Sequence, residues 1–265
     1  MDTLVLRALE NLIQRDVPSF RVRFKNESMV LRALGVLTAP FIPEFMTNVT
    51  TTLGSTVWFP NRARYEGDPE RSFRTLTHEY VHLWDKERSP LFFLKYAFPQ
   101  LLAVIPVLGF TILAWPWSWL VALPAFGYVL AALLVRKSRL AAAAVFGVFG
   151  LAMVGLSIWL VGWASFAILA ALICLIPWPA PWRSEAELRG YTMDFAIRTW
   201  QGRKETLDLA KYLPHFIGPT YYFMDWRSIA ELQRLHAMSA LVRAGKLGPP
   251  YTAVQDLMIR FNLIK

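Results

Sequence analysis

Polar and apolar positions in the first part of the chain alternate with two different periods. Residues 3–15 carry an apolar stripe at helical spacing, which predicts an amphipathic helix with Asp2 as its N-cap. Residues 19–24 alternate apolar and basic side chains, as expected of a strand with one buried face. Residues 28–37 predict a short helix.

A strand and a longer helix follow. Residues 49–59 are rich in β-branched and aromatic side chains and predict a strand, with a bend or bulge at Gly54. Residues 69–87 predict a helix, because Asp68 can act as its N-cap and Pro69 favours the first helical position.

Residues 91–182 form a long apolar block with few charges. A membrane span needs ~20 apolar residues, and four segments approach that length, of which the last is the shortest. The block therefore predicts four transmembrane helices, with two as the alternative. The segments are residues 97–115, 117–135, 140–161 and 166–178.

Composition supports a membrane protein. Of the 265 residues, 55% are hydrophobic, and the mean hydropathy is +0.35, which is too apolar for an ordinary globular domain. The single cysteine, Cys174, excludes an intrachain disulfide. The net charge of +9 has no dense basic run interleaved with aromatic residues. We therefore expect a lipid bilayer as partner and no nucleic acid.

The third part of the chain is again helical. Ser184 can cap a helix at the end of the apolar block, and its pattern continues to about residue 212. Residues 225–245 and 252–262 predict two further helices.

The most informative motif is His78-Glu79-Tyr80-Val81-His82, an HExxH sequence inside the predicted helix 69–87. Positions i and i+4 share one helix face, so His78 and His82 can bind one ion together. Two imidazoles, a carboxylate and an open position for water form a ligand set that suits zinc. Binding to zinc lowers the pKa of the water to about 7. Glu79 lies beside them and can act as the general base.

A zinc site of this kind needs a third ligand. Glu187 is the first candidate, because Gly190 one turn later would let two helices approach closely; Glu185 is the alternative. Asp194 shares a face with Glu187 and could accept a hydrogen bond from the second nitrogen of a ligand histidine. Both glutamates could instead simply favour the start of a helix.

Three further residues are candidates for stabilising an oxyanion during peptide hydrolysis. They lie in an aromatic, loop-like segment and are His215, Tyr221 and Tyr222. Aromatic packing is the alternative role for the same side chains.

The position of Glu187 constrains the topology. If it reaches the histidines, the segments before and after the apolar block lie on the same side of a membrane, and the number of spans is even. With four spans the basic residues 136–139 share that side, and the positive-inside rule makes it cytoplasmic. The sequence thus predicts a multi-pass protein of the inner or plasma membrane, with its metal site facing the cytoplasm.

The two motifs resemble those of integral-membrane gluzincins of the HtpX and CAAX-prenyl endopeptidase type. In that family the third ligand lies in an ExxAD pattern, and here residues 187–191 keep the glutamate and the small residue but have Tyr191 in place of the aspartate. The expected spans before HExxH are also absent. The resemblance implies peptide-bond hydrolysis with His78, His82 and Glu187 as zinc ligands and Glu79 as general base. Zincin-type domains also commonly place a strand before the HExxH helix, along the substrate cleft.

Together these features predict an α+β zincin-like domain joined to a transmembrane helical bundle. Residues 1–90 form the zincin-like region, residues 91–182 the transmembrane block, and residues 183–265 a helical region that supplies the third ligand. The predicted function is a membrane-anchored zinc metallopeptidase acting on peptides or membrane-protein segments. The alternative is a non-catalytic membrane scaffold or interaction protein that retains a zincin-like domain; a transporter is disfavoured by the shortage of ionisable residues in the block.

Overall fold

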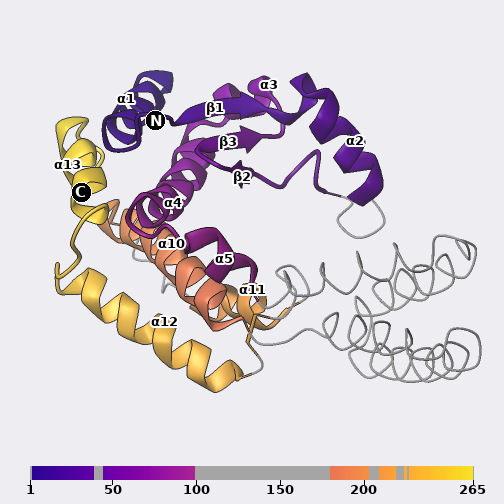
Figure 1. Cartoon of the computed structure of the whole chain (residues 1–265). Coiled ribbons are helices and arrows are strands. Elements are labelled where there is room, and N and C mark those ends of the chain that lie inside the picture. The colour runs from indigo at the N-terminus through magenta and orange to yellow at the C-terminus, as the bar shows by residue number, and fades with distance from the viewer. Residues whose placement is uncertain are drawn as a thin grey trace, which may run out of the picture. The chain divides into compact units, whose positions relative to one another are not determined.

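The computed structural model describes residues 2–38, 44–98, 180–202, 209–218, 224–225 and 227–264. In these ranges the protein is a mostly helical α+β structure with one three-stranded sheet (Figure 1). Backbone contacts divide the chain into two units. The first contains residues 1–93, 184–214 and 227–265, and the second contains residues 94–183 and 215–226.

Most of the expected elements are present with small changes at their ends. In chain order the elements are α1 (Thr3–Asp16), β1 (Arg21–Phe24), η1 (Lys25–Glu27), α2 (Met29–Thr38), β2 (Thr51–Leu53), β3 (Thr56–Phe59), α3 (Arg62–Gly67), α4 (Pro69–Arg88), α5 (Phe92–Ala97), α10 (Pro181–Trp200), η5 (Leu209–Lys211), α11 (Leu213–Ile217), α12 (Ser228–Arg243) and α13 (Tyr251–Arg260). The helix expected to run to about residue 212 ends earlier, at Trp200, and residues 203–208 lie outside the described ranges.

The sheet has the strand order β1-β3-β2, with β1 parallel and β2 antiparallel to β3. The single strand predicted over residues 49–59 is instead a hairpin. Gly54 adopts a φ of 64°, a conformation that glycine reaches without strain, and the chain reverses there between β2 and β3. Strand β2 therefore lies at an edge of the described sheet.

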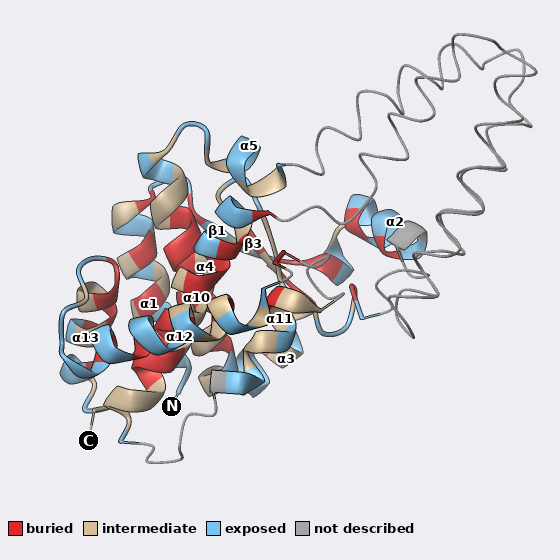
Figure 2. Cartoon of the chain, turned by 90° about the horizontal axis from the view of Figure 1, so that it is seen from below, coloured by how far each residue is buried: buried red, intermediate tan, exposed pale blue. Residues whose placement is uncertain are grey.

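Helix α4 begins as the sequence predicts. The Asp68 side chain accepts a hydrogen bond from the Arg71 backbone N–H, and Pro69 occupies the first turn. Its apolar side, with Phe73, Leu76 and Leu83, is fully buried. These residues join a core that α1, the sheet, α10 and α13 complete, and Figure 2 shows the buried positions on the inward faces of these helices.

The predicted transmembrane bundle and the multi-pass membrane localisation are corrected by the structure. Within the described ranges no helix combines the length and the apolar character that crossing a membrane requires. Helices α4 and α10 have 20 residues each but carry charged side chains along their length. Both predictions rested on the hydropathy of residues 97–178, which lie outside the described residues apart from Ala97 and Phe98.

A buried lysine ties the segment before β2 to the end of β1. Lys25 is fully buried, and its Nζ donates hydrogen bonds of 2.9 Å to the carbonyl oxygens of Phe45 and Val49. The same nitrogen lies 3.7 Å from the centre of the Phe45 ring. Burial lowers the pKa of Lys25 to about 8, and the negative charge of Glu79 opposes that shift.

The lowered pKa of Lys25 predicts a pH-dependent contribution to stability. Its ordinary value is 10.5, so between about pH 8 and 10.5 the unfolded chain holds a proton that the folded chain has released. The free energy of unfolding should therefore rise with pH in this window. Measured by urea denaturation, it should rise ~2 kcal/mol more in the wild type than in Lys25→Met between about pH 7.5 and 9.5.

Lys246→Met provides the matched control, because Lys246 is exposed. Its pH dependence should follow that of the wild type. Parallel profiles for the wild type and Lys25→Met would contradict the prediction.

Candidate metal centre

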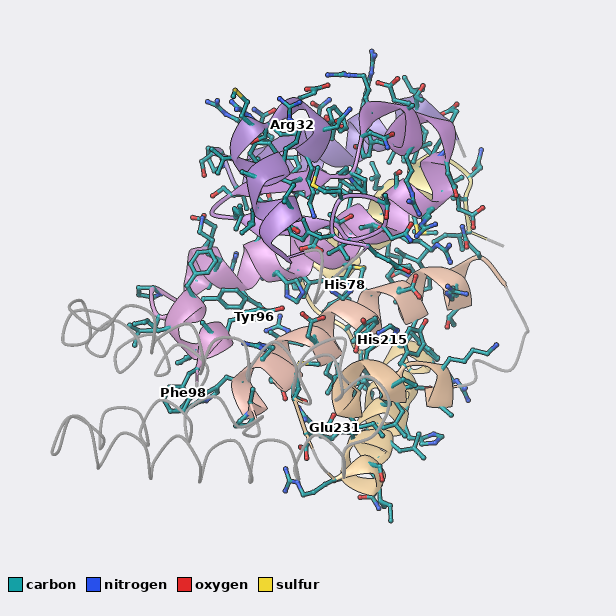
Figure 3. The ribbon with its side chains drawn as sticks, turned by 90° about the vertical axis from the view of Figure 1, so that its right-hand side faces the viewer. Arg32, His78, Tyr96, Phe98, His215 and Glu231 are labelled. Carbon is teal, nitrogen blue, oxygen red and sulfur yellow. The ribbon has the colours of Figure 1, made fainter. Side chains whose placement is uncertain are left out.

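The candidate metal centre lies between α4 and α10. The residues of α4 that face α10 recur at about one helical turn and are Arg74, His78, His82 and Asp85. Their partners on α10 are Asp194, Glu187 and Arg189, so the two helices lie side by side along this line of contacts, the α4–α10 seam. Figure 3 shows His78 between the two ribbons.

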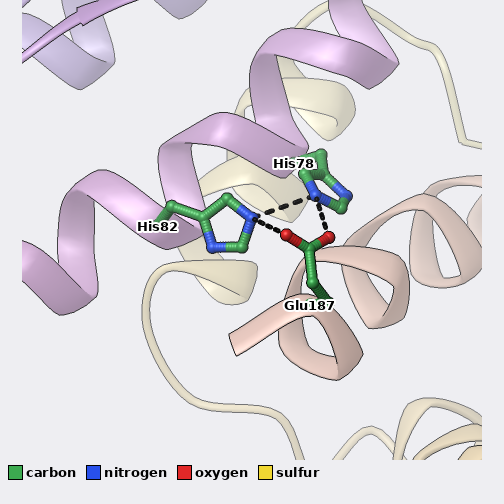
Figure 4. A group of neighbouring side chains, drawn as sticks. All are labelled: His78, His82 and Glu187. Atoms are coloured by element: carbon green, nitrogen blue, oxygen red, sulfur yellow. Dashed lines mark hydrogen bonds and ion pairs between the residues drawn. The ribbon is translucent and has the colours of Figure 1, made fainter. Parts of the chain in front are cut away.

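Three side chains converge there: His78 and His82 from α4, and Glu187 from α10 (Figure 4). The two Nε2 atoms of the histidines are 3.0 Å apart. Nε2 of His78 lies 3.4 Å from Oε2 of Glu187, and Nε2 of His82 lies 3.6 Å from Oε1. All three side chains are buried or nearly so, with Glu187 only 2% exposed.

These separations fit a single metal ion. Zinc binds imidazole nitrogen and carboxylate oxygen at ~2.1 Å, and tetrahedral ligands at that radius lie ~3.4 Å from one another. The three measured separations of 3.0, 3.4 and 3.6 Å bracket this value. The donor set also matches the two-histidine, one-glutamate sites of catalytic zinc. The chain's residues therefore fit the metal that the sequence predicts.

The electrostatics of the two histidines differ. Burial lowers the pKa of His78, but the hydrogen bond and charge of Glu187 outweigh burial, so the pKa is raised. Burial also lowers the pKa of His82, and there it prevails over the charge of Glu187. The carboxylate thus compensates a pair of imidazoles that are both withdrawn from water.

Gly190 allows α10 to approach the His78 ring. A Cβ atom at this position would lie 2.5 Å from Cε1 and 2.6 Å from Nε2 of His78, far inside van der Waals contact. Gly190 follows Glu187 by one turn, so the missing side chain lies where the glutamate needs the two helices to be close. The sequence-based explanation of this glycine is confirmed.

Further contacts fix α10 along its length. Arg189 forms an ion pair of 2.8 Å with Asp85, near the end of α4. The hydroxyl of Tyr251, on α13, donates to the carbonyl oxygen of Arg189 at 2.9 Å. Asp85 therefore joins the end of α4 to α10.

The first turn of α10 is held by α12. Ser184 donates to the buried carboxylate of Glu231 at 3.0 Å, and Arg234 bonds both groups (Glu231 is labelled in Figure 3). Arg234 also pairs with Glu185, whose side chain is 59% exposed. Of the two glutamates considered as third ligand, the structure brings Glu187 to the histidines and directs Glu185 to α12.

Glu79 is held from the sheet. The hydroxyl of Thr52, on β2, donates to Oε2 of Glu79 at 2.7 Å. Glu79 is half-buried and follows His78 directly in α4. The predicted general base therefore lies next to the three converging ligands, with one carboxylate oxygen already bonded.

Asp194 lies on the same seam, further along α10. Its carboxylate accepts hydrogen bonds from Arg198 at 2.9 Å and from Tyr212 at 2.5 Å, and lies 3.9 Å from Arg74. Its negative charge helps to raise the pKa of His78. Its effect on the metal centre is therefore electrostatic, and the expected hydrogen bond to a ligand histidine stays a prediction.

Tyr191 occupies the position where the family pattern has aspartate. Its ring meets the His78 ring edge-on, with 5.0 Å between centroids, and packs against Tyr212 at 5.2 Å. The ring of Tyr191, supported by Tyr212, thus restricts the orientation of the His78 ring on one side.

The role of the three candidates for oxyanion stabilisation stays a prediction. His215 lies in α11 and belongs to the second unit. Tyr221 and Tyr222 lie outside the described residues.

Sequence reasoning missed Thr52, Tyr191 and Tyr212 as neighbours of the site. The available signal for Thr52 was its place on the strand before the HExxH helix, where a hydroxyl can reach the base. Tyr191 stood out only as a departure from the ExxAD pattern, and Tyr212, which lies between η5 and α11, carried no comparable signal.

No protein-family model, curated protein or solved structure matches this chain. The chemistry of the site therefore rests on its own residues.

Gly190→Ala should weaken metal binding without unfolding the protein. The new methyl group must displace the His78 ring, which moves its Nε2 away from the other two ligands. We expect zinc affinity, measured by competition with a chromophoric chelator, to fall ~10-fold or more, the usual range for disturbing the support of a ligand. Helix content by circular dichroism should be retained, since alanine favours helix by ~1 kcal/mol over glycine.

Gly67→Ala is the matched control, since no atom lies within 4 Å of a Cβ at that helical position. It should bind zinc as the wild type does. Equal zinc affinity in Gly190→Ala and Gly67→Ala would show that the close approach is not needed for binding.

Proposed function

We propose that the protein is a zinc-dependent peptidase. The observation that carries this proposal is the convergence of His78, His82 and Glu187, whose ligand atoms all lie within 4.8 Å of one another. A bound zinc ion at this centre would polarise the scissile carbonyl and promote ionisation of the attacking water.

Glu79 supplies the proton transfers. Its Oε2 accepts the Thr52 hydrogen bond, so Oε1 takes the proton of the attacking water as the new C–O bond forms. The same oxygen then gives that proton to the leaving amine as the C–N bond breaks. One water is consumed, and a carboxylate and an amine are released.

The chain's other residues keep this geometry fixed. Glu187 holds both imidazoles from α10, and Gly190 sets how closely α10 lies to α4. Arg189 and Asp85 join the two helices about one turn from His82. Catalysis depends on such positioning, since displacement of a reacting group by ~1 Å can cost ~100-fold in rate.

Metal binding tests the ligand set directly. The purified full chain should bind one zinc, measured by elemental analysis and chelator competition. His78→Ala, His82→Ala and Glu187→Ala should each lower the affinity ~100-fold or more, because each removes one of the three ligands that the described residues bring together.

Two substitutions serve as matched controls. His236→Ala removes an exposed histidine of α12, and Glu185→Ala removes the glutamate that pairs with Arg234. Both should retain zinc affinity. Absence of zinc from the wild type, or equal losses in Glu185→Ala and Glu187→Ala, would refute the proposed centre.

Replacement of the general base separates chemistry from metal binding. Glu79→Gln should keep zinc but lower hydrolysis of fluorescein-labelled casein by ~10²–10⁴-fold, the usual contribution of a positioned base. Glu87→Gln, on the same helix and partly exposed, is the matched control and should hydrolyse casein at the wild-type rate.

Full activity of Glu79→Gln would overturn the assignment of the base. A wild type that binds zinc but cleaves no peptide bond would instead favour the non-catalytic alternative, a scaffold that retains the metal centre.

A further inference from the structure

A single hydrogen bond links the edge of the sheet to the centre. Thr52 Oγ1 donates to Glu79 Oε2 at 2.7 Å, the length of a strong bond between a hydroxyl and a carboxylate. The two residues are far apart in sequence and belong to different elements, β2 and α4. The orientation of Glu79 thus depends on the position of a strand that contributes no ligand.

The register of the hairpin explains why Thr52 points toward α4. Thr52 is paired with Val57 across the antiparallel strands, so their side chains lie on the same face of the sheet. Val57 is fully buried in the core that α4 helps to form. Thr51, the preceding residue, must point to the opposite face because side chains alternate along a strand.

The segment that leads into β2 is also held in place, by a buried lysine. Lys25 bonds the carbonyl oxygens of Phe45 and Val49, in the segment that enters β2. Because Lys25 directly follows β1, it fixes this segment to the end of the strand at the opposite edge of the sheet. The Thr52 hydroxyl is therefore presented to Glu79 from a strand restrained by pairing with β3 and by a buried cation.

We propose that Thr52 is a positioning residue that fixes Glu79 in the orientation required for proton transfer. Its hydroxyl occupies Oε2 and leaves Oε1 directed to the reacting water. This inference rests on the proposed peptidase function and adds a residue to its machinery. A carboxylate without this bond would sample several rotamers, since a half-buried glutamate has three rotatable bonds.

The test uses acetohydroxamate, a zinc chelator whose N–H and O–H groups can bond a carboxylate beside the metal. Its affinity for the zinc-loaded full chain is measured by calorimetry. Thr52→Val, which keeps the shape and removes the donor, should weaken binding ~10-fold, because Glu79 is then no longer held in the orientation that bonds the ligand and must be ordered on binding. Zinc affinity itself should be unchanged, since Thr52 is not a ligand.

Two variants distinguish positioning from a structural role. Thr52→Ser restores the hydroxyl and should bind acetohydroxamate within about twofold of the wild type. Thr51→Val, the matched control on the opposite face, should also behave as the wild type. Loss of affinity in Thr51→Val or in Thr52→Ser as large as in Thr52→Val would mean that strand stability, not the hydroxyl, is responsible, and would overturn the inference.

A double-mutant cycle identifies the partner. In a Glu79→Ala background, Thr52→Val should change acetohydroxamate affinity by less than about twofold, because the group it positions is gone. An undiminished ~10-fold loss in that background would show that Thr52 acts without Glu79.

The failure of this inference is distinct from failure of the proposed function. A wild type without zinc defeats the peptidase proposal and this inference together. Equal acetohydroxamate affinities in a zinc-binding wild type and in Thr52→Val defeat only the role of Thr52.

Discussion

The structure depends on the close packing of α10 against α4 at Gly190. The two histidines of α4 lie on one face by helical geometry alone, but two imidazoles do not make a three-ligand centre. Glu187 supplies a carboxylate from a separate helix, and its hydrogen bond and charge raise the pKa of His78 against the effect of burial. Its carboxylate reaches both nitrogens because no side chain at Gly190 separates the helices.

Contacts around this seam explain how such a short separation is maintained. An ion pair between Asp85 and Arg189 joins the helices beyond His82, and Tyr251 holds the same stretch of α10 from the C-terminal helix. At the start of α10, buried Glu231 and Arg234 attach it to α12. Buried ionic contacts are poor sources of net stability but are specific in geometry, which suits a centre that tolerates little displacement.

Helix periodicity and capping, which depend only on residues close in sequence, predicted the parts of the site that lie within one helix. The start of α4, the shared face of His78 and His82, and the reason for Gly190 all follow from helix geometry and capping. The same rules identified helices such as α1 and α4, in which apolar side chains recur at helical spacing and become buried. They did not separate a bent strand from a hairpin at Gly54, since both need the same flexible residue.

Tertiary contacts account for what the sequence could not decide. Gly190 favoured Glu187 over Glu185 in the sequence but did not decide between them. The two residues face different sides of α10 by helix geometry, and the packing of α10 between α4 and α12 brings Glu187 to the histidines and Glu185 to Arg234. Thr52 required the hairpin register. The expectation of a membrane bundle came from the hydropathy of one block, whereas no described helix is long and apolar enough to cross a membrane.

The separation of the ligands along the chain has a consequence for biosynthesis. The ribosome delivers His78 and His82 long before Glu187, so the growing chain first exposes a two-ligand fragment that binds metal weakly. On the proposed function, tight binding of zinc would begin only when α10 has been made and has docked on α4. Binding of the ion would then be a late step of maturation, and a chain in which α10 fails to dock would be left with only two ligands.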